Sequence, residues 1–547
     1  MALSTNTVIV IAAILLLVYR LGRIGQRPKG YPPGPPTLPL IGNLHQMPKK
    51  KAHLQFQKWA QEYGPVYSLI LGTKVMVVLS SDQAIKDLLD KRSNIYSSRP
   101  EAYLGNVVSN NERVLLMEYG EKWRMIRRLI HSSLNIKAAR TYVPYQDLEN
   151  KAMLLGFLDG PGQFIHHIRR YANSLSTQML FGFRTTSNDD PRLKQLFQSF
   201  EGFSDVMGSA AAAVTDVFPI LRYLPDTLLP MRKRAKELHQ SESALFLGHY
   251  REAKNKVKEG QAKPCLCVDL VRAQDKQGFS DLTAAYISGS LLEAGSDTTS
   301  ATLVGWVQAM TLFPEVSKAG QAEIDRVCGD RFPDLNDLPD LPYIRGCMKE
   351  SMRWMPTVIL GVPHAVICDD EYMGYKIPKG AGVMLNVWGI HNDPKRHSDP
   401  RRFDPTRWAS DSQTSVEAAN NPDASKRDHF IFGAGRRLCQ GMHIADRSLF
   451  LAMSRLLWAF DFNRAIDGET GNEIVPSIEA LIPDGGMFVQ PEAFEASIKP
   501  RSEQRAQRVR DEWSKATELL DDEMQWKVVP EDLIWRDYEP AEAAAKA

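Results

Sequence analysis

The stretch FGAGRRLCQG, residues 432–441, contains the most informative cysteine of the chain. Gly435 and Gly441 bracket Cys439, and a residue without a Cβ lets backbone amides approach the sulfur closely. Backbone donors and a basic neighbour favour the thiolate, which is the form of cysteine that ligates metals. We therefore expect Cys439 to be a metal ligand. The alternative is an inert, buried cysteine in a glycine-rich turn.

This stretch resembles the haem-binding loop of the cytochrome P450 family, FxxGxRxCxG, at all five fixed positions. The resemblance implies haem b (iron protoporphyrin IX) as the cofactor and Cys439 as the axial ligand of its iron. An axial thiolate donates electron density that favours O–O cleavage. By the same resemblance Phe432 packs on the thiolate side of the haem, and the guanidinium of Arg437 pairs with a haem propionate.

Two further segments are expected near the haem propionates. Trp123 and Arg127 are four residues apart, so on a helix they share one face, and the family directs such a pair at a propionate. His364 occupies a place where the family often has another propionate partner. A histidine satisfied elsewhere in the core is the alternative at this position.

Glu350 and Arg353 are three residues apart, which places an acid and a base on one helical face. The stretch PRRFDPTRW, residues 400–408, is similar to the family's second arginine motif. The resemblance implies that Glu350, Arg353 and Arg407 form a buried network of charges behind the haem. One carboxylate facing two guanidinium groups is consistent with burial, so we assign these three residues to structure and not to chemistry.

Residues 281–313 contain no proline, are mostly apolar and are followed by Pro314, which predicts a buried helix roughly 50 Å long. The stretch AGSDTT, residues 294–299, places polar side chains near its middle. Serine and threonine hydroxyls bond back to the preceding turn, which predicts a local groove for a small ligand. The family has an acid–alcohol pair here, so Asp297 and Thr298 are expected to deliver protons to bound O2. A helix bend with self-satisfied hydroxyls is the alternative.

The N-terminal residues 1–21 are expected to be a membrane anchor. Residues 8–19 are continuously apolar, no charged residue precedes Arg20, and Arg23, Arg27 and Lys29 follow. Positive charge after an apolar segment keeps that end in the cytoplasm, which predicts a single span with the catalytic domain cytosolic. The alternatives are a cleaved signal peptide and a peripheral segment. Residues 22–39 are predicted to be a basic, proline-rich linker.

Residues 40–509 are expected to form one domain that is mainly α with minor β. Helical periodicity dominates, with short strand-like runs at 74–79 and 383–387, and residues 252–264 predict a surface connection. The resemblance makes this a single cytochrome P450-type haem-thiolate domain behind the N-terminal transmembrane helix. Residues 510–547 are predicted to be a charged C-terminal tail.

Composition excludes several other classes of protein. Lys plus Arg number 67 and Asp plus Glu number 65, so the net charge of +2 argues against a dedicated nucleic-acid binder. Six cysteines in 547 residues, without regular spacing, favour a reduced, cytosol-facing chain. The resemblance then implies the endoplasmic reticulum membrane as the location.

The sequence and the resemblance also indicate a redox partner and a class of substrate. No dinucleotide-binding GxGxxG follows a strand, so electrons from NADPH must arrive through a separate protein. By resemblance this partner is the membrane-bound NADPH–cytochrome P450 reductase. The substrate pocket is expected from family position along residues 99–118 and at seven further residues, which are largely apolar and favour a lipophilic small molecule. These residues are Ala294, Val358, Ile359, Leu360, Val362, Leu481 and Ile482.

Residues 379–408 and 498–501 are similar to fungal microsomal (class II) members of the family, among them O-methylsterigmatocystin oxidoreductase and phenol-coupling enzymes. The resemblance implies a monooxygenase that uses O2 to oxidise an aromatic polyketide or another fungal secondary metabolite. The first alternative is oxidative phenol coupling, which dimerises an aromatic polyketide such as a coumarin or naphthopyrone. A non-catalytic haem sensor or carrier is the remaining alternative.

Overall fold

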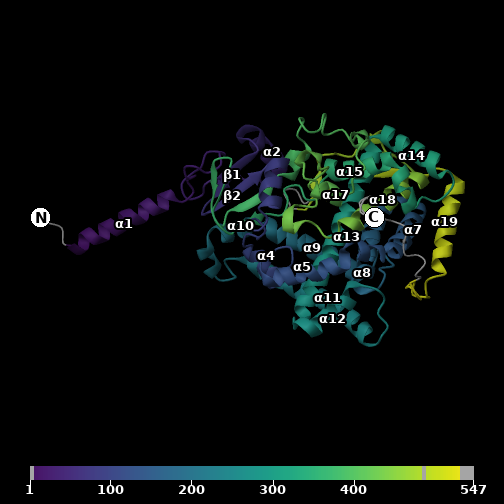
Figure 1. Ribbon diagram of the computed structural model, residues 1–547, viewed down its shortest axis with the longest axis horizontal. Helices are drawn as coiled ribbons and strands as arrows, with labels where there is room; N and C mark the ends of the chain where they lie inside the picture. Colours follow the sequence, from purple (N-terminus) through teal and green to yellow (C-terminus); the bar gives the residue numbers. More distant parts are fainter. Residues whose placement is uncertain (1–4, 483–487, 530–547) are drawn as a thin grey trace.

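Helices make up most of the chain in the computed structural model, which describes residues 5–482 and 488–529 (Figure 1). The predicted mainly α fold with minor β is confirmed. The α-helices of the described residues are α1 (Thr5–Arg23), α2 (Ala52–Tyr63), α3 (Asp82–Ile85), α4 (Tyr103–Ser109), α5 (Glu121–Leu134), α6 (Ile136–Arg140), α7 (Val143–Asp159), α8 (Phe164–Phe181), α9 (Pro191–Gly208), α10 (Ala210–Val217), α11 (Pro230–Lys258), α12 (Leu266–Gln277), α13 (Asp281–Leu312), α14 (Pro314–Cys328), α15 (Pro342–Trp354), α16 (Val387–His391), α17 (Ser415–Asn420), α18 (Met442–Ala459) and α19 (Glu503–Thr517).

The strands form small sheets beside the helices. The largest has the order β1-β2-β6-β3, in which β1 pairs antiparallel with β2, and β2 pairs parallel with β6. The strands of the described residues are β1 (Val66–Leu71), β2 (Lys74–Leu79), β3 (His364–Ala365), β4 (Asp370–Tyr372), β5 (Tyr375–Ile377), β6 (Gly382–Leu385), β7 (Phe460–Ile466), β8 (Glu473–Ile474), β9 (Leu481–Ile482), β10 (Gln490–Pro491) and β11 (Ala496–Pro500).

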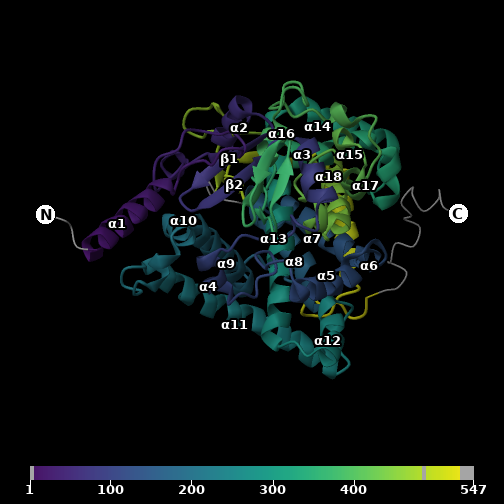
Figure 2. The same ribbon diagram turned by 60° about the vertical axis from the view of Figure 1, so that its left-hand side comes forward.

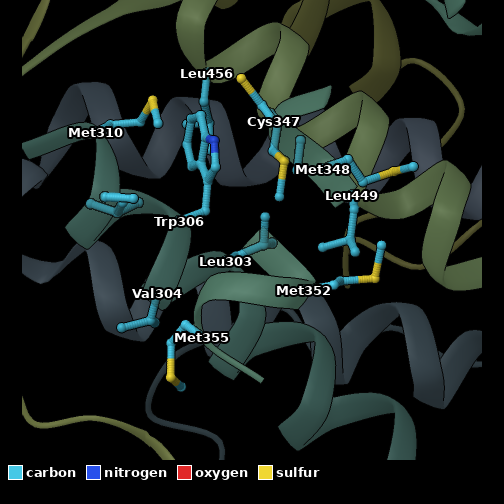
Figure 3. Close-up of a cluster of buried hydrophobic side chains, with 14 of the residues drawn as sticks. Leu303, Val304, Trp306, Met310, Cys347, Met348, Met352, Met355, Leu449 and Leu456 are labelled. Carbon is cyan, nitrogen blue, oxygen red and sulfur yellow. The ribbon is translucent and has the colours of Figure 1, made fainter. Parts of the chain in front are cut away.

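The main hydrophobic core lies where α13 meets α15 and α18 (Figure 3). Trp306 of α13 is fully buried, and sulfur-containing side chains such as Cys347 and Met352 of α15 pack in the same cluster. Methionine fills irregular gaps because its side chain is flexible and polarisable. This core fixes α13 against α18, the helix that follows the 432–441 loop.

Helix α1 extends away from the rest of the molecule, starting from the end at which β1 and β2 lie (Figures 1 and 2). No helix within residues 5–482 and 488–529 is both long and apolar enough to cross a membrane, so the predicted transmembrane span is not confirmed there. Residues 1–4 of that prediction lie outside the described residues. Arg27, in the predicted linker, donates hydrogen bonds to the carbonyls of Gly34 and Ser68, both at 2.9 Å.

The structure differs from the prediction in the expected surface connection and at the start of the expected C-terminal tail. Helix α11 continues to Lys258, so residues 252–258 are helical and not part of a surface connection. Helix α19 runs through residues 509 and 510 and contacts α7. Beyond it, the indole of Trp526 is buried and donates a hydrogen bond of 2.6 Å to Gln178 of α8. Residues 530–547 of the predicted tail lie outside the described residues.

Candidate active site

The 432–441 loop folds back on itself immediately before α18. The backbone N–H of Cys439 donates to the carbonyl of Phe432 at 3.0 Å, and the N–H of Gly441 donates to the Cys439 sulfur at 3.3 Å. Phe432 is half-buried and meets His429 edge-to-face. Burial raises the pKa of the Cys439 thiol, while the Gly441 N–H and Arg127 lower it. The backbone donor and the basic neighbour that the sequence predicts are present, but burial has the larger effect on the pKa. The protein alone therefore does not favour the thiolate.

The two glycines of the loop have different roles. Gly435 has φ +60°, and a Cβ there would lie 1.9 Å from the carbonyl oxygen of Leu89. Its N–H donates to Asp90 at 2.7 Å and does not reach the sulfur. A Cβ at Gly441 would lie 3.7 Å from the Cys439 sulfur, an ordinary contact distance. The loop therefore requires glycine at 435 because of close packing, while Gly441 contributes through its N–H.

Three arginines converge beside this loop, and we call Arg99, Arg127 and Arg437 the arginine cluster. Arg437 donates to the carbonyls of Ser97 (2.8 Å) and Met117 (2.7 Å), and Arg127 donates to the carbonyl of Leu438. Arg99 donates to three backbone carbonyls, those of Leu115 (3.0 Å), Val362 (2.7 Å) and Pro363 (2.8 Å). In the described part of the chain no carboxylate pairs with any of the three.

Electrostatics show that the positive charge of the arginine cluster is uncompensated. Burial lowers the pKa of Arg99 to about 9 and that of Arg127 to about 10. The pKa of Arg437 falls to about 8, because burial acts together with repulsion from Arg99 and Arg127. A buried guanidinium is costly unless an anion pairs with it. The cluster is therefore suited to a ligand that brings negative charge.

Trp123 and His364 lie beside the arginine cluster. The guanidinium carbon of Arg437 is 4.1 Å from the ring centre of Trp123, and that of Arg127 is 5.8 Å from it. The Nδ1 atom of His364 is 2.7 Å from the carbonyl of Tyr96. Burial, and next Arg99, lower the pKa of His364 to about 3, so its ring is neutral. The structure thus brings together the residues that the sequence placed at the propionates.

Arg99 was missed as a member of this group by sequence reasoning, which placed residues 99–118 only on a pocket wall. Its partners Val362 and Pro363 are more than 260 residues away, at a separation of 263 for Val362. No local spacing pattern connects such distant segments. The tertiary fold is what identifies Arg99.

Glu350, Arg353 and Arg407 form the predicted charge network, which we call the Glu350 network. Arg353 donates to both carboxylate oxygens of Glu350, at 2.6 and 2.8 Å, and Arg407 donates at 3.3 Å. The indole N–H of Trp408 and the backbone N–H of Asp404 each donate to the same carboxylate at 3.0 Å. Glu350 and Arg353 are completely buried. Every charge here has a partner within the chain.

Helix α13 continues without a break through the polar segment at its centre. The Thr298 hydroxyl donates to the carbonyl of Ala294 at 2.7 Å, as the bonding back to the preceding turn predicts. Burial raises the pKa of Asp297 to about 6, although Arg169 lowers it. Ala294 is exposed in a helix whose other side chains are mostly buried. An acid with a pKa of about 6 and a hydroxyl group are thus adjacent in the middle of α13.

The expected pocket residues are placed in different surroundings. Val358 and Val362 are half-buried. Ile359 is completely buried in the main core, where Leu360 and Leu481 also lie, while Ile482 is exposed. Several of these side chains therefore pack against protein within the described residues.

The residues present fit a haem. The group carries two propionate carboxylates, which match an arginine cluster without its own anions. It also takes a thiolate ligand, which Cys439 can offer from the 432–441 loop. The donor set thus combines one soft sulfur ligand with buried cations for two carboxylates.

Known proteins resemble this chain over almost all of its length. The sequence profile of the family described as Cytochrome P450 matches residues 32–491. The chain is 61% identical over 531 residues to cytochrome P450 monooxygenase virE of Hypocrea virens. This alignment covers 97% of this chain and 96% of that protein. It is 56% identical over 538 residues to cytochrome P450 monooxygenase fogE of Aspergillus ruber, with coverage of 98% and 99%.

Solved structures agree with this likeness. A zebra fish cytochrome P450 determined with abiraterone is 25% identical and superimposes with a TM-score of 0.64, covering 82% of this chain and all of that chain. The family uses haem b, O2 and electrons supplied by a reductase, and it acts on small molecules. The family profile, the fungal relatives and the Cys439 loop together show that this chain belongs to the cytochrome P450 family, as a haem-dependent monooxygenase.

Proposed function

We propose that this chain oxidises a lipophilic small molecule, an aromatic polyketide or another fungal secondary metabolite, with electrons from NADPH delivered by NADPH–cytochrome P450 reductase. The arginine cluster beside the Cys439 loop carries the proposal, because one buried and two half-buried cations without carboxylate partners in the described part of the chain match the haem propionates. The fungal origin of the two relatives named above supports the substrate class.

The cofactor would be held by residues of three segments. Cys439 would provide the sulfur ligand of the iron, and Arg99, Arg127 and Arg437 would pair with the propionates, while Trp123 packs against Arg437. His364 would lie beside a propionate without donating to it, because its neutral ring donates from Nδ1 to the Tyr96 carbonyl at 2.7 Å and leaves Nε2 as an acceptor. When bound, haem supplies the iron at which O2 is activated.

Asp297 and Thr298 hold and move the proton that this chemistry consumes. The pKa of about 6 lets Asp297 take up and release a proton near neutral pH. The Thr298 hydroxyl donates to the Ala294 carbonyl, and its oxygen can still accept a hydrogen bond from a neighbouring donor. Glu350, Arg353 and Arg407 hold the fold and take no part in proton transfer.

Mass spectrometry of products from a microsomal reconstitution tests the proposal. The full-length protein, reductase and NADPH are supplied with a panel of phenolic polyketides. We expect a product equal to substrate plus one oxygen. A dimer that has lost two hydrogens per new bond would instead establish phenol coupling. Failure to oxidise polyketides, terpenoids and fatty acids alike would leave a haem sensor or carrier and would contradict the proposal.

A Thr298→Ala variant tests the proton-handling pair in the same reconstitution. Loss of the hydroxyl should reduce product formed per NADPH by about tenfold or more, since positioned acid–base groups contribute at least this much. Thr302→Ala is the matched control, because its hydroxyl bonds the Thr298 carbonyl one turn away. Unchanged coupled turnover in Thr298→Ala would contradict the assigned role.

The location proposed for the chain is the cytosolic face of the endoplasmic reticulum membrane. Helix α1 exposes apolar side chains, among them Ile9, Leu15 and Tyr19, and residues Ile220 and Tyr223 after α10 are also exposed. Apolar surface of this kind is favourable against lipid. The full-length protein should sediment with microsomes in the presence of salt. Recovery in the supernatant would contradict this location.

A further inference from the structure

A buried cluster of one cation and two acids lies next to the polar segment of α13. Arg113, in the loop after α4, donates hydrogen bonds to Glu242 of α11 and to Glu293 of α13. All three side chains are buried, with exposed fractions of 3%, 0% and 4%. The guanidinium of Arg113 also lies 3.8 Å from the ring centre of Phe203 in α9. We call these three charged residues the Arg113 cluster.

The charges of the Arg113 cluster do not balance when both acids are ionised. Arg113 is the one permanent cation that faces both carboxyl groups within the described residues. Burial is the largest influence on either acid and raises the pKa of Glu242 and of Glu293. Two buried carboxylates that share one guanidinium leave one charge uncompensated, which a bound proton removes. One of the two acids therefore stays protonated near neutral pH.

Other titratable groups surround these acids. Tyr286 of α13 and His239 of α11 face Glu242, and the His239 Nδ1 atom is 3.1 Å from the Tyr286 hydroxyl. The charge of Asp297 acts on Glu293 and raises its pKa further. Asp297 itself faces Arg169 of α8 and Glu201 of α9. None of these neighbours supplies a second cation to Glu293.

The position of Glu293 connects the Arg113 cluster to the proposed proton-handling pair. Glu293 and Asp297 are four residues apart on α13, so they lie on one face with Cβ atoms about 5–6 Å apart. One carboxyl oxygen of Glu293 (Oε1) is buried and has no hydrogen-bond partner among the residues that the structure describes. A buried carboxyl oxygen in this state can carry a proton and can donate it through a single bridging water.

We propose that the Arg113 cluster stores one exchangeable proton and that Glu293 passes this proton to Asp297. The transfer breaks an O–H bond at Glu293 and forms one at the Asp297 carboxylate, and no electrons move. One proton taken up from water then replaces the stored proton on the two carboxylates of Glu242 and Glu293, so the cluster returns to its starting state. Glu293 is thus a positioning residue that acts through Asp297, and this role rests on the proposed function of Asp297 and Thr298.

Infrared spectroscopy of the full-length, haem-loaded protein tests the stored proton directly. At slightly alkaline pH, above the pKa of about 6 of Asp297, wild-type protein should show a protonated carboxyl C=O band that shifts in D2O. The band should be lost in Glu293→Gln. Glu252→Gln on α11 is the matched control, because Glu252 pairs with Arg192 near the surface and should leave the band unchanged. A band that persists in Glu293→Gln would overturn the proposal.

The transfer itself is tested by NADPH consumption with reductase, O2 and no organic substrate, which forms hydrogen peroxide from O2, NADPH and a proton. Loss of the stored proton as pH rises should give wild type an alkaline decline in rate. Glu293→Gln should be slower by about tenfold or more and should lack that decline, while Glu252→Gln behaves as wild type. A Glu293→Gln variant with the wild-type rate and pH profile would overturn the transfer, even if its infrared band is lost.

Asp297→Asn separates this inference from the proposed function. If Asp297→Asn keeps the wild-type rate, the proposed role of Asp297 fails and the stored proton has no acceptor. If Asp297→Asn is slow while Glu293→Gln is unchanged, only the transfer from Glu293 fails. Should Glu293→Gln not retain haem, Glu242→Gln carries the test. It should lose the band and the alkaline decline, and a wild-type result in both measurements would overturn the proposal.

Discussion

The Glu350 network and the arginine cluster are both groups of buried guanidinium side chains, yet their charges are handled in opposite ways. In the Glu350 network one carboxylate accepts from Arg353, Arg407, Trp408 and a backbone N–H, so the charges are met within the chain. In the arginine cluster the guanidinium groups donate only to backbone carbonyls in the part of the chain that the structure describes. We call the Glu350 network closed, because its charges are neutralised within the chain, and such a network supports the fold. We call the arginine cluster open, because its charges are left for a bound anion.

Breaking the closed network should have the largest effect. Glu350→Gln leaves two buried guanidinium groups without their anion, and we expect the free energy of unfolding to fall by about 3–5 kcal/mol. Urea denaturation of the haem-loaded protein measures this change. Glu479→Gln is the control, because Glu479 forms an exposed ion pair with Lys51 and should change stability by less than about 1 kcal/mol. Similar losses in both variants would contradict the contrast.

Breaking the open cluster should affect cofactor binding and not the fold. Arg437→Gln removes a charge-assisted bond of about 1.5–3 kcal/mol to a propionate, so haem should dissociate about 10–100-fold faster. Transfer of haem to an excess of a haem-scavenging protein measures this rate. Arg436→Gln, at the exposed neighbouring position, should retain haem like wild type. Equal dissociation rates for wild type and Arg437→Gln would show that Arg437 does not hold the cofactor.

Asp297 extends the comparison to a single half-buried acid. Its folded-state pKa of about 6 lies above the ordinary value of 3.8, so its contribution to stability is fully present below pH 3.8 and is lost as pH rises through 6. Asp297→Asn should therefore be more stable than wild type at pH 8 by about 1–2 kcal/mol, with the difference vanishing at pH 4. Denaturation at both pH values checks this. A constant difference would contradict the raised pKa.

The smallest effect is expected at Gly441. Its φ of −83° is accessible to any residue, and a Cβ there meets the Cys439 sulfur at an ordinary distance. Gly441→Ala should keep the haem and change the free energy of unfolding by less than about 1 kcal/mol. Thermal denaturation and the haem-to-protein ratio measure both. Gly435→Ala is the contrasting variant and should not retain haem, because of its positive φ and its close contact with Leu89.

The sequence predicted those features that depend on local patterns. Residues 74–79 form β2 as their short strand-like run predicts, and the proline-free stretch from 281 forms α13 up to Leu312. The spacings of Glu350 with Arg353 and of Trp123 with Arg127 placed each pair on one helical face. Local periodicity and short-range spacing are properties that a chain expresses before it folds.

Features that depend on long-range packing could not be predicted in this way. Arg99 joins the arginine cluster only because the fold brings residues 362 and 363 to it. The Arg113 cluster likewise unites residues separated by 129 and 180 positions. The need for glycine at 435 comes from the carbonyl of Leu89, on a different element. In each case the deciding atom lies far away in sequence.

The absorption spectrum of the reduced, carbon monoxide-treated protein tests the central claim, that the sulfur of Cys439 is the axial ligand of haem iron. Full-length protein is purified, reduced and exposed to carbon monoxide, with Cys439→Ser as the control. We predict the absorption maximum of thiolate-ligated haem in wild type and its absence in the variant. A wild-type protein that retains no haem, or one whose maximum is that of a nitrogen-ligated haem, would contradict the claim.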